Sequence, residues 1–233
     1  MNLLEVIDAS RILLNEPLSS GRTFPDNTSS FWTDSQLTTY HNLIQQELQQ
    51  TIIQADEDYF VTQAYLSVVA GTAEYALPTN TIKVVRVEDN RDTSSPRELN
   101  PVTINHREVL YPPTYFLTSQ ATWNGGYYLR GQQIILTDTP NYTNSAVVRV
   151  HFVRRLADVT AGSDTSELPG EHHRALVWGI TKYALFQEQA GDAYVQASGE
   201  YEKMTARIQK EVEARQIQRP RRVTQAQGYY GEG

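Results

Sequence analysis

Apolar residues recur at steps of three and four in several stretches of the chain, which is the spacing of one face of an α-helix. This pattern predicts a first helix over residues 2–14. A second helix is predicted over residues 34–55, because Thr33 and Gln36 have the spacing of a capping box just before the apolar stripe. The residues expected in that stripe are Leu37, Tyr40, Ile44, Leu48, Ile52 and Ala55.

Helical spacing returns in the last third of the chain. A helix is predicted to begin near Pro169 and to end at Gly191, and Asp192 is expected to cap the helix that follows. The apolar positions of this last helix are Tyr194, Ala197, Tyr201, Met204 and Ile208. The two segments are therefore predicted to form a hairpin of two helices.

From residue 59 to residue 153 the apolar period changes from helical spacing to alternation, which is typical of β-strands. Turns are expected near Gly71, at Asn124–Gly125 and at Arg130–Gly131. The segment "TIKVVRVED" begins at residue 81, and strict alternation in it places Ile82 and Val84 opposite Val85 and Val87. Six or seven short strands with frequent turns predict a small antiparallel sandwich or barrel.

The order of these elements predicts an α+β fold. We expect a four-helix bundle-like α domain with the small antiparallel β sandwich or barrel inserted into it, and an extended C-terminal tail. The expected parts are residues 1–57 for the first helices, 58–156 for the β insert, 157–215 for the helical hairpin and 216–233 for a flexible basic tail. The tail has no apolar stripe, so it is expected to become ordered only on binding.

Composition limits the classes of function. The chain has no cysteine and no apolar run of the roughly 20 residues that a membrane span needs. Its net charge is −7, but residues 207–233 hold six bases and three acids, a net +3, while the remaining 14 bases and 24 acids give −10. This distribution argues against a protein that coats nucleic acid over its whole surface, and it describes an acidic body with a basic tail.

The cluster Glu171–His172–His173 is the most evident candidate for a metal or acid-base site, since the chain has only five histidines. Adjacent helical residues point about 100° apart, and no further ligand lies four residues away, so the spacing of a helical zinc site is missing. The favoured interpretation is a helix start, with Glu171 near the positive end of the helix dipole. The two histidines are then expected at the surface or at a subunit contact, where protonation near pH 6.5 would change assembly.

No other motif indicates catalysis, so we predict a protein that is not an enzyme and assign no catalytic, cofactor-binding or metal-ligating residue. Aromatic residues in the β region, including Trp123, Tyr127 and Tyr128, would either stack on sugar rings or pack in the core or against another subunit, and core or subunit packing is favoured. The acidic run Asp56–Asp58 is expected to be a solvated surface.

The basic tail is the strongest candidate for a binding site. It combines arginine and tyrosine, which are the side chains most often used as interface anchors. Contact with DNA phosphates and a terminus without function are the alternatives, and docking into an acidic groove of a protein partner is favoured over both. The candidate docking residues are Arg215, Arg219, Arg221, Arg222, Tyr229 and Tyr230.

Four segments in a characteristic order give the sequence a family resemblance. They are "FWTDSQLTTYHNLIQQEL", "VVAGTAEYALPTNTIKVVRVED", "YYLRGQQIILTDTP" and "LPGEHHRALVWGITKYAL", which are spread from about residue 31 to residue 205. With these segments the chain resembles the head-to-tail adaptor (connector) proteins of tailed bacteriophages, and most closely the adaptors of short-tailed phages.

The resemblance implies a structural protein of the virion neck, assembled in the host cytoplasm as a homo-oligomeric, twelve-fold ring. It implies that the segment after about Gln209 embraces the portal protein, that the tail nozzle or the next tail component binds on the other side, and that double-stranded DNA passes through the ring without specific binding. An acidic channel wall suits that passage. Asp56, Glu57, Asp58 and Asp89 are candidates for the wall. Another neck or tail-completion protein, or a glycan-binding β-sandwich tail component that uses Trp123, Tyr127 and Tyr128, remains an alternative.

Overall fold

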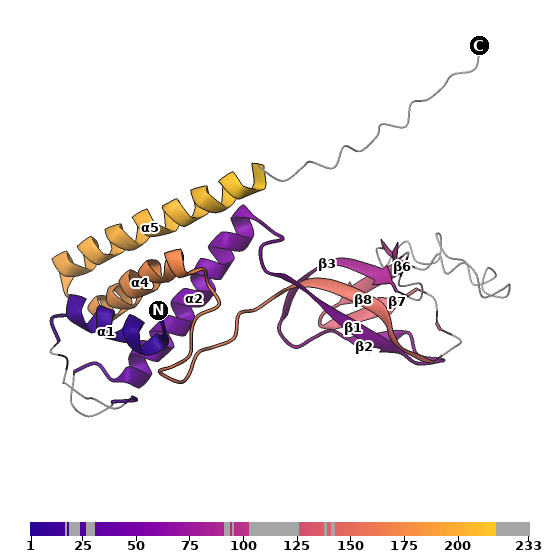
Figure 1. Cartoon of the computed structure of the whole chain (residues 1–233), viewed down its shortest axis with the longest axis horizontal. Helices are drawn as coiled ribbons and strands as arrows, with labels where there is room; N and C mark the ends of the chain where they lie inside the picture. The colour runs from indigo at the N-terminus through magenta and orange to yellow at the C-terminus, as the bar shows by residue number, and fades with distance from the viewer. Residues whose placement is uncertain are drawn as a thin grey trace, which may run out of the picture. The chain divides into compact units, whose positions relative to one another are not determined.

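The computed structural model describes residues 1–16, 18, 24–26, 31–90, 94, 96–102, 126–137, 139–140 and 143–217. The chain divides into two compact units. The helical unit comprises Met1–Asp56 and Val159–Gly233, and the strand unit comprises Glu57–Asp158. Figure 1 shows helices in the first unit and strands in the second. The predicted α+β class is therefore confirmed.

The described part of the helical unit contains four α-helices, α1 (Leu3–Leu13), α2 (Asp34–Ala55), α4 (His173–Gln187) and α5 (Gly191–Ile217), and a 3₁₀ turn, η3 (Gly170–His172), that leads into α4. Helices α2 and α4 each contact the other three, and α4 makes the more extensive contacts. In Figure 1, α5 runs along α4 at one edge of the unit.

The start of α2 is the one that the sequence predicts. The backbone N–H of Gln36 donates to Thr33 Oγ1 at 3.2 Å, and the backbone N–H of Thr33 donates to Gln36 Oε1 at 3.1 Å, which completes the capping box. Five of the six predicted stripe residues are buried and Tyr40 is half-buried. The same face of α2 also buries His41, Gln45 and Gln49, so this core stripe carries polar groups that apolar spacing does not reveal.

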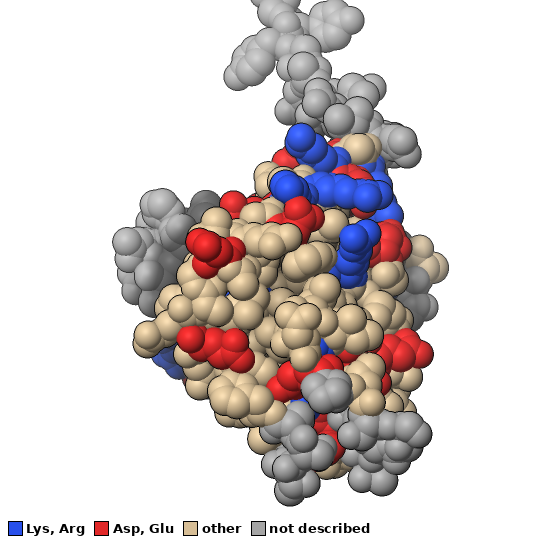
Figure 2. Space-filling view, turned by 90° about the vertical axis from the view of Figure 1, so that its left-hand side faces the viewer, with Lys and Arg blue, Asp and Glu red and all other residues tan. Residues whose placement is uncertain are grey.

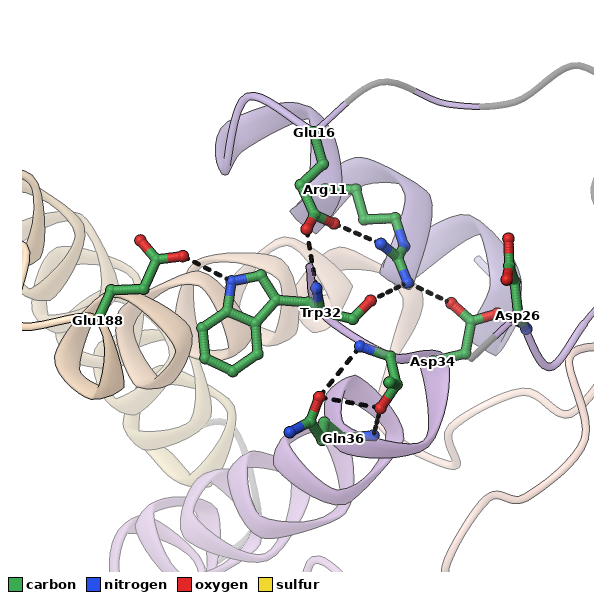
Figure 3. Close-up of polar contacts among 8 residues, drawn as sticks. Arg11, Glu16, Asp26, Trp32, Asp34, Gln36 and Glu188 are labelled. Atoms are coloured by element: carbon green, nitrogen blue, oxygen red, sulfur yellow. Dashed lines mark hydrogen bonds and ion pairs between the residues drawn. The ribbon is translucent and has the colours of Figure 1, made fainter. Parts of the chain in front are cut away.

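A buried arginine fastens α1 to the start of α2 (Figure 3). The guanidinium of Arg11 is ion-paired with Glu16 and donates from Nη2 to Asp34 Oδ1 at 2.8 Å and to the carbonyl oxygen of Trp32. Glu16 Oε1 also accepts from the backbone N–H of Trp32 at 2.9 Å. The indole Nε1 of Trp32 then donates to Glu188 at 2.9 Å, which extends the network to the end of α4.

The histidines are part of the helical core. His172 and His173 are 2% and 3% exposed, so the expectation that they lie at the surface or at a subunit contact is wrong. The ring Nε2 of His173 lies 3.0 Å from the carbonyl oxygen of Leu168 in the chain that leads into α4. Burial lowers the pKa of both histidines, and it lowers the pKa of His41 to about 4. These imidazoles are therefore neutral packing groups at neutral pH.

The turn between α4 and α5 differs from the prediction. Helix α4 ends at Gln187, and the residue with a left-handed backbone is Gln189, with a φ of 59°, whereas Gly191 begins α5. Of the five predicted apolar positions of α5, Ala197, Tyr201 and Ile208 are buried, and Tyr194 and Met204 are half-buried. Asp192 lies in the first turn of α5, where its charge is favourable for the helix dipole.

The described residues of the strand unit form a sandwich of two four-stranded sheets. One sheet has the order β1-β8-β3-β4 and the other β2-β7-β6-β5, and every pairing is antiparallel except β5 with β6. Side chains of both sheets form one hydrophobic core. The strands are β1 (Val61–Val68), β2 (Glu74–Ala76), β3 (Thr81–Asp89), β4 (Arg97–Glu98), β5 (Asn100–Pro101), β6 (Gly126–Arg130), β7 (Gln133–Leu136) and β8 (Asn144–Arg154).

A β-bulge changes the predicted faces of β3. The register of β3 against β8 shifts between Val84 and Arg86, so the strand carries one extra residue there. Val84 and Val87 consequently both pack against the core, whereas Val85 is exposed. Strict alternation had placed Val84 and Val87 on opposite faces, which is wrong because a bulge moves the next side chain to the other face.

The predicted glycine turns occur at Gly71 and Gly131, whose φ angles are +79° and +59°. Backbone of this kind strains any residue with a Cβ, which explains why glycine occupies both turns. The predicted turn at Asn124–Gly125 lies outside the described residues.

We expect Arg11→Met to destabilise the helical unit by about 3 kcal/mol, because it leaves the carboxylates of Glu16 and Asp34 without their buried cation. Urea denaturation followed by circular dichroism measures this loss. Arg130→Met is the matched control, since Arg130 makes an exposed ion pair with Glu74 and its loss should cost less than about 1 kcal/mol. Equal stabilities of the two variants would contradict the role given to Arg11.

Gly179→Ala tests the close packing of α4 on α2. A Cβ at Gly179 would lie 2.7–2.9 Å from three side-chain carbons of the fully buried Ile44, so α4 would have to move. We expect a loss of about 1–3 kcal/mol in thermal or urea unfolding. Gly199→Ala in α5 is the control, because nothing lies within 4 Å of its added Cβ and the change should stabilise by up to about 1 kcal/mol.

The buried His41 predicts a loss of stability in acid. Its folded-state pKa of about 4 lies below the ordinary value of 6.5, so the stability from its neutral form is complete above pH 6.5 and is lost as pH falls toward 4. The loss should reach roughly 3 kcal/mol. Urea titrations between pH 7 and pH 4 should show a smaller pH dependence for His41→Gln than for the wild-type chain. Parallel curves would overturn this assignment.

Candidate functional site

The predicted docking residues fall into two groups. Arg215 lies near the end of α5, where it is 51% exposed and its Nη2 is 2.9 Å from Glu171 Oε1. Ion pairs of this exposure contribute little to folding, so this one does not prevent binding to a partner. The other five residues lie outside the described part of the chain, and their role stays a prediction. They are Arg219, Arg221, Arg222, Tyr229 and Tyr230.

The outer face of α5 carries a basic surface that sequence reasoning missed. Lys203, Arg207 and Lys210 are spaced four and three residues apart and are exposed, on the side of α5 away from the buried Tyr201 and Ile208. We call this surface the α5 groove; it borders an open, shallow depression of about 550 Å³ along one face of the helix. Its lining residues are Lys203, Ala206, Arg207, Lys210, Glu211 and Ala214. The spacing of these bases along α5 was the sequence signal from which this surface could have been predicted.

Two ion pairs along the helix organise the α5 groove. Lys203 Nζ lies 2.7 Å from Glu200 Oε1, and Arg207 Nε donates to Glu211 Oε1 at 2.7 Å. Both bases remain more than 70% exposed, so their charge is accessible to a partner. Figure 2 shows most Lys and Arg side chains gathered at the upper part of this view, whereas Asp and Glu are spread over the whole view, including among these bases.

The inner face of α5 is held by a carboxylate on α2. Glu47 accepts hydrogen bonds from the hydroxyls of Tyr183 on α4 and Tyr201 on α5. The hydrogen bond to Glu47, together with burial, raises the pKa of Tyr183 to about 12, and burial and the same carboxylate raise the pKa of Tyr201. The ammonium of Lys182 lies 4.6 Å from the centre of the Tyr201 ring. These contacts fix which side of α5 faces solvent.

A second exposed surface lies where α4 turns into α5. Phe186 and Val195 are 66% and 67% exposed, and the Phe186 ring lies 5.5 Å from the ring of Tyr194. We call this surface the α4–α5 corner. Beside it is a hollow of about 470 Å³ that is lined by Leu185, Phe186, Gln187, Gln189, Ala190, Gly191 and Tyr194. Exposed aromatic side chains beside a hollow are typical of protein-binding surfaces.

Burial corrects part of the acidic surface expected from the sequence. Asp56 and Asp89 are 1% and 4% exposed, so neither is a solvated side chain or a candidate for a channel wall. Glu57 and Asp58 are exposed, and Glu57 is ion-paired with Lys83. Glu88, which is also buried, binds Arg149, Arg86 and His151.

The charge partners of Glu88 account for its ionisation. Burial alone would raise the pKa of Glu88, but hydrogen bonds from His151 and Arg149 and the charges of Arg86 and Arg149 hold that pKa below its ordinary value. His151 Nε2 lies 3.2 Å from the Glu88 carboxylate. The cluster joins the neighbouring strands β3 and β8 and is a satisfied structural network.

The aromatic residues considered for glycan binding are only partly described. Tyr127 and Tyr128 are buried, and Tyr127 belongs to the core of the sandwich, so core packing is confirmed for it and neither ring is free to stack on a sugar. Trp123 lies outside the described residues. Within the described ranges, no cluster of three or more potential ligands is arranged to hold a metal ion, and no helix has the length and apolarity of a membrane span.

Comparison with known proteins gives the family. The SU10 adaptor protein family matches residues 1–226, which is nearly the whole chain. A search of the curated proteins finds no match. The match covers both compact units, so the α4–α5 corner and the α5 groove lie within the part of the chain that defines the family. The chain therefore belongs to the SU10 adaptor protein family, and the resemblance of its sequence to phage head-to-tail adaptors is confirmed.

Proposed function

We propose that the protein is the structural head-to-tail adaptor of a tailed-bacteriophage virion. In this role copies of the chain assemble into a ring, with twelve subunits as the expected number, between the portal protein and the tail nozzle or next tail component. The observation that carries the proposal is the family match over residues 1–226. The ring would be built in the host cytoplasm, and its work would be docking rather than catalysis.

Docking to the portal is assigned to the end of α5 and the segment after it. Helix α5 continues to Ile217, so the basic segment starts at the end of a helix that is fixed to the unit by Glu47. Arg215 presents an exposed guanidinium there, and guanidinium groups suit an acidic groove because they bind carboxylates in a planar, bidentate way. The two tyrosines near the C-terminus would add apolar anchors.

The acidic net charge supports the passage of DNA without specific binding. A net charge of −7 repels phosphate groups over the surface as a whole, whereas a basic channel would retain the DNA. Glu57 and Asp58 are the remaining candidates for the channel wall, since Asp56 and Asp89 are buried. Burial of Tyr127 and Tyr128 argues against a glycan-binding role, because two of its three proposed residues are not exposed to stack on a sugar.

Deletion of residues 218–233 tests the docking assignment. Every element from α1 to α5 remains, because α5 ends at Ile217, so we expect an unchanged far-ultraviolet circular dichroism spectrum and unfolding curve. Capture of the truncated chain by immobilised portal protein should be lost. Full-strength capture of the truncated chain would overturn the assignment.

Two sets of substitutions separate the contribution of the tail arginines to portal binding from that of the tail tyrosines. Replacement of Arg219, Arg221 and Arg222 by Gln, and separately of Tyr229 and Tyr230 by Ser, should each weaken portal binding at least about tenfold if both types of side chain are anchors. Arg130→Gln is the control, because Arg130 is an exposed base of the strand unit that is paired with Glu74. It should bind the portal like the unmodified chain.

A further inference from the structure

The α4–α5 corner exposes side chains that could insert into a depression on a partner. Its exposed apolar side chains are Phe186 and Val195, and two exposed acids belong to the same turn, Glu188 at the end of α4 and Asp192 in the first turn of α5. One carboxylate oxygen of Glu188 accepts from Trp32, so this acid is held in place. The corner therefore combines an apolar centre with an acidic margin, and a partner that matches it needs a small apolar floor beside positive charge.

The α5 groove has the complementary chemistry. Ala206 and Ala214 are its small side chains, and Lys203, Arg207 and Lys210 outnumber the one acid of the lining, Glu211, so its net charge is positive. An aromatic ring can approach a helix closely where the side chains are alanine. The net charge of the groove is opposite to that of the corner, so one copy of this chain carries both halves of a complementary contact.

The two halves cannot meet within one subunit. Asp192 and Lys210 are eighteen residues apart on the same helix, α5, which at about 1.5 Å per residue separates them by roughly 27 Å along the helix axis. The corner of one copy can therefore reach only the groove of another copy. A contact that joins two different surfaces of identical subunits is heterologous, and it propagates from copy to copy until a ring closes.

Tertiary contacts hold both the α4–α5 corner and the α5 groove in place, which favours a specific contact between subunits over a non-specific one. The corner is fixed by the bond from Trp32 to Glu188, and Trp32 is itself held by the Arg11 network (Figure 3). The groove is fixed by the contacts of Tyr201 with Glu47 on the opposite face of α5. Rigid surfaces lose little conformational freedom when they bind.

We propose that the α4–α5 corner of one copy inserts into the α5 groove of the next copy and that this contact closes the subunit ring. Phe186 lies against Ala206, and the carboxylates of Glu188 and Asp192 meet Lys203, Arg207 and Lys210, the bases around that alanine. The proposal specifies the subunit contact of the proposed adaptor ring, and so it rests on that function.

Substitution of the apolar centre is the first test. Phe186→Ser and Val195→Ser change exposed side chains, so the subunit should stay folded by circular dichroism. Sedimentation velocity of the full chain, alone and with portal protein, should show the ring for the wild-type chain and a loss of self-association of about tenfold or more for each variant. Leu129→Ser is the matched control, because Leu129 is 46% exposed in the strand unit and should leave the ring intact.

Charge complementation is the second test and identifies the paired surfaces. Asp192→Lys places a base against the basic groove, and Lys210→Glu places an acid against the acidic corner, so each variant alone should fail to form rings. An equimolar mixture should recover them, because the base introduced in the corner of one variant then meets the acid introduced in the groove of the other. Recovery that weakens with added salt is the expected result. A mixture that stays unassembled overturns the proposed pairing.

The outcomes separate this inference from the function on which it rests. A wild-type ring that persists in Phe186→Ser overturns the contact and leaves the adaptor function standing. Variants that keep the ring but lose portal capture show that the corner binds the portal, which also overturns the contact. A wild-type chain that forms no ring, either alone or with portal protein, overturns the proposed function itself.

Discussion

The packing of the helical unit depends on the buried ion pairs and hydrogen bonds of the Arg11 guanidinium. This guanidinium brings Glu16, Asp34 and the carbonyl oxygen of Trp32 together in the protein interior, and these groups belong to the end of α1 and the entry to α2. A buried cation is tolerated only when carboxylates surround it, so the position of each of these elements is linked to the others. Because Trp32 also binds Glu188, the link reaches the end of α4 and the exposed corner beside it.

Helix α5 shows how the core prepares a surface for binding. Its inner face packs against the helical unit through Tyr201, which lies in the core and donates a hydrogen bond from its hydroxyl to Glu47 on α2. Because that face is buried, Lys203, Arg207 and Lys210 lie on the outer side of α5, together with two alanines. A long helix held along one side is a rigid support, and it ends where the basic segment of the chain begins. Membership of an adaptor family and this exposed basic helix are both consistent with a protein that binds partners through its surface.

Much of the fold follows from local rules. The capping box of Thr33 and Gln36 fixes the start of α2, and the glycines at positions 71 and 131 occupy turns that need positive φ. The candidate site was less predictable. The sequence pointed to Arg215 and the residues after it, but the α5 groove was missed because a lone i, i+4, i+7 row of bases usually means a solvated face. The bulge in β3 was also invisible, since register depends on the partner strand β8.

The sequence by itself determined which of the described segments form helices and strands and where the turns at Gly71 and Gly131 fall, because spacing, capping and backbone conformation act between residues close in the chain. Tertiary structure decided which polar groups are buried. His172, His173 and Asp56 look like surface residues in the sequence and lie in the interior, because burial of a polar group depends on partners from distant segments. It also decided that the two complementary surfaces of the chain are the α4–α5 corner and the α5 groove, since exposure is what remains after every helix has packed.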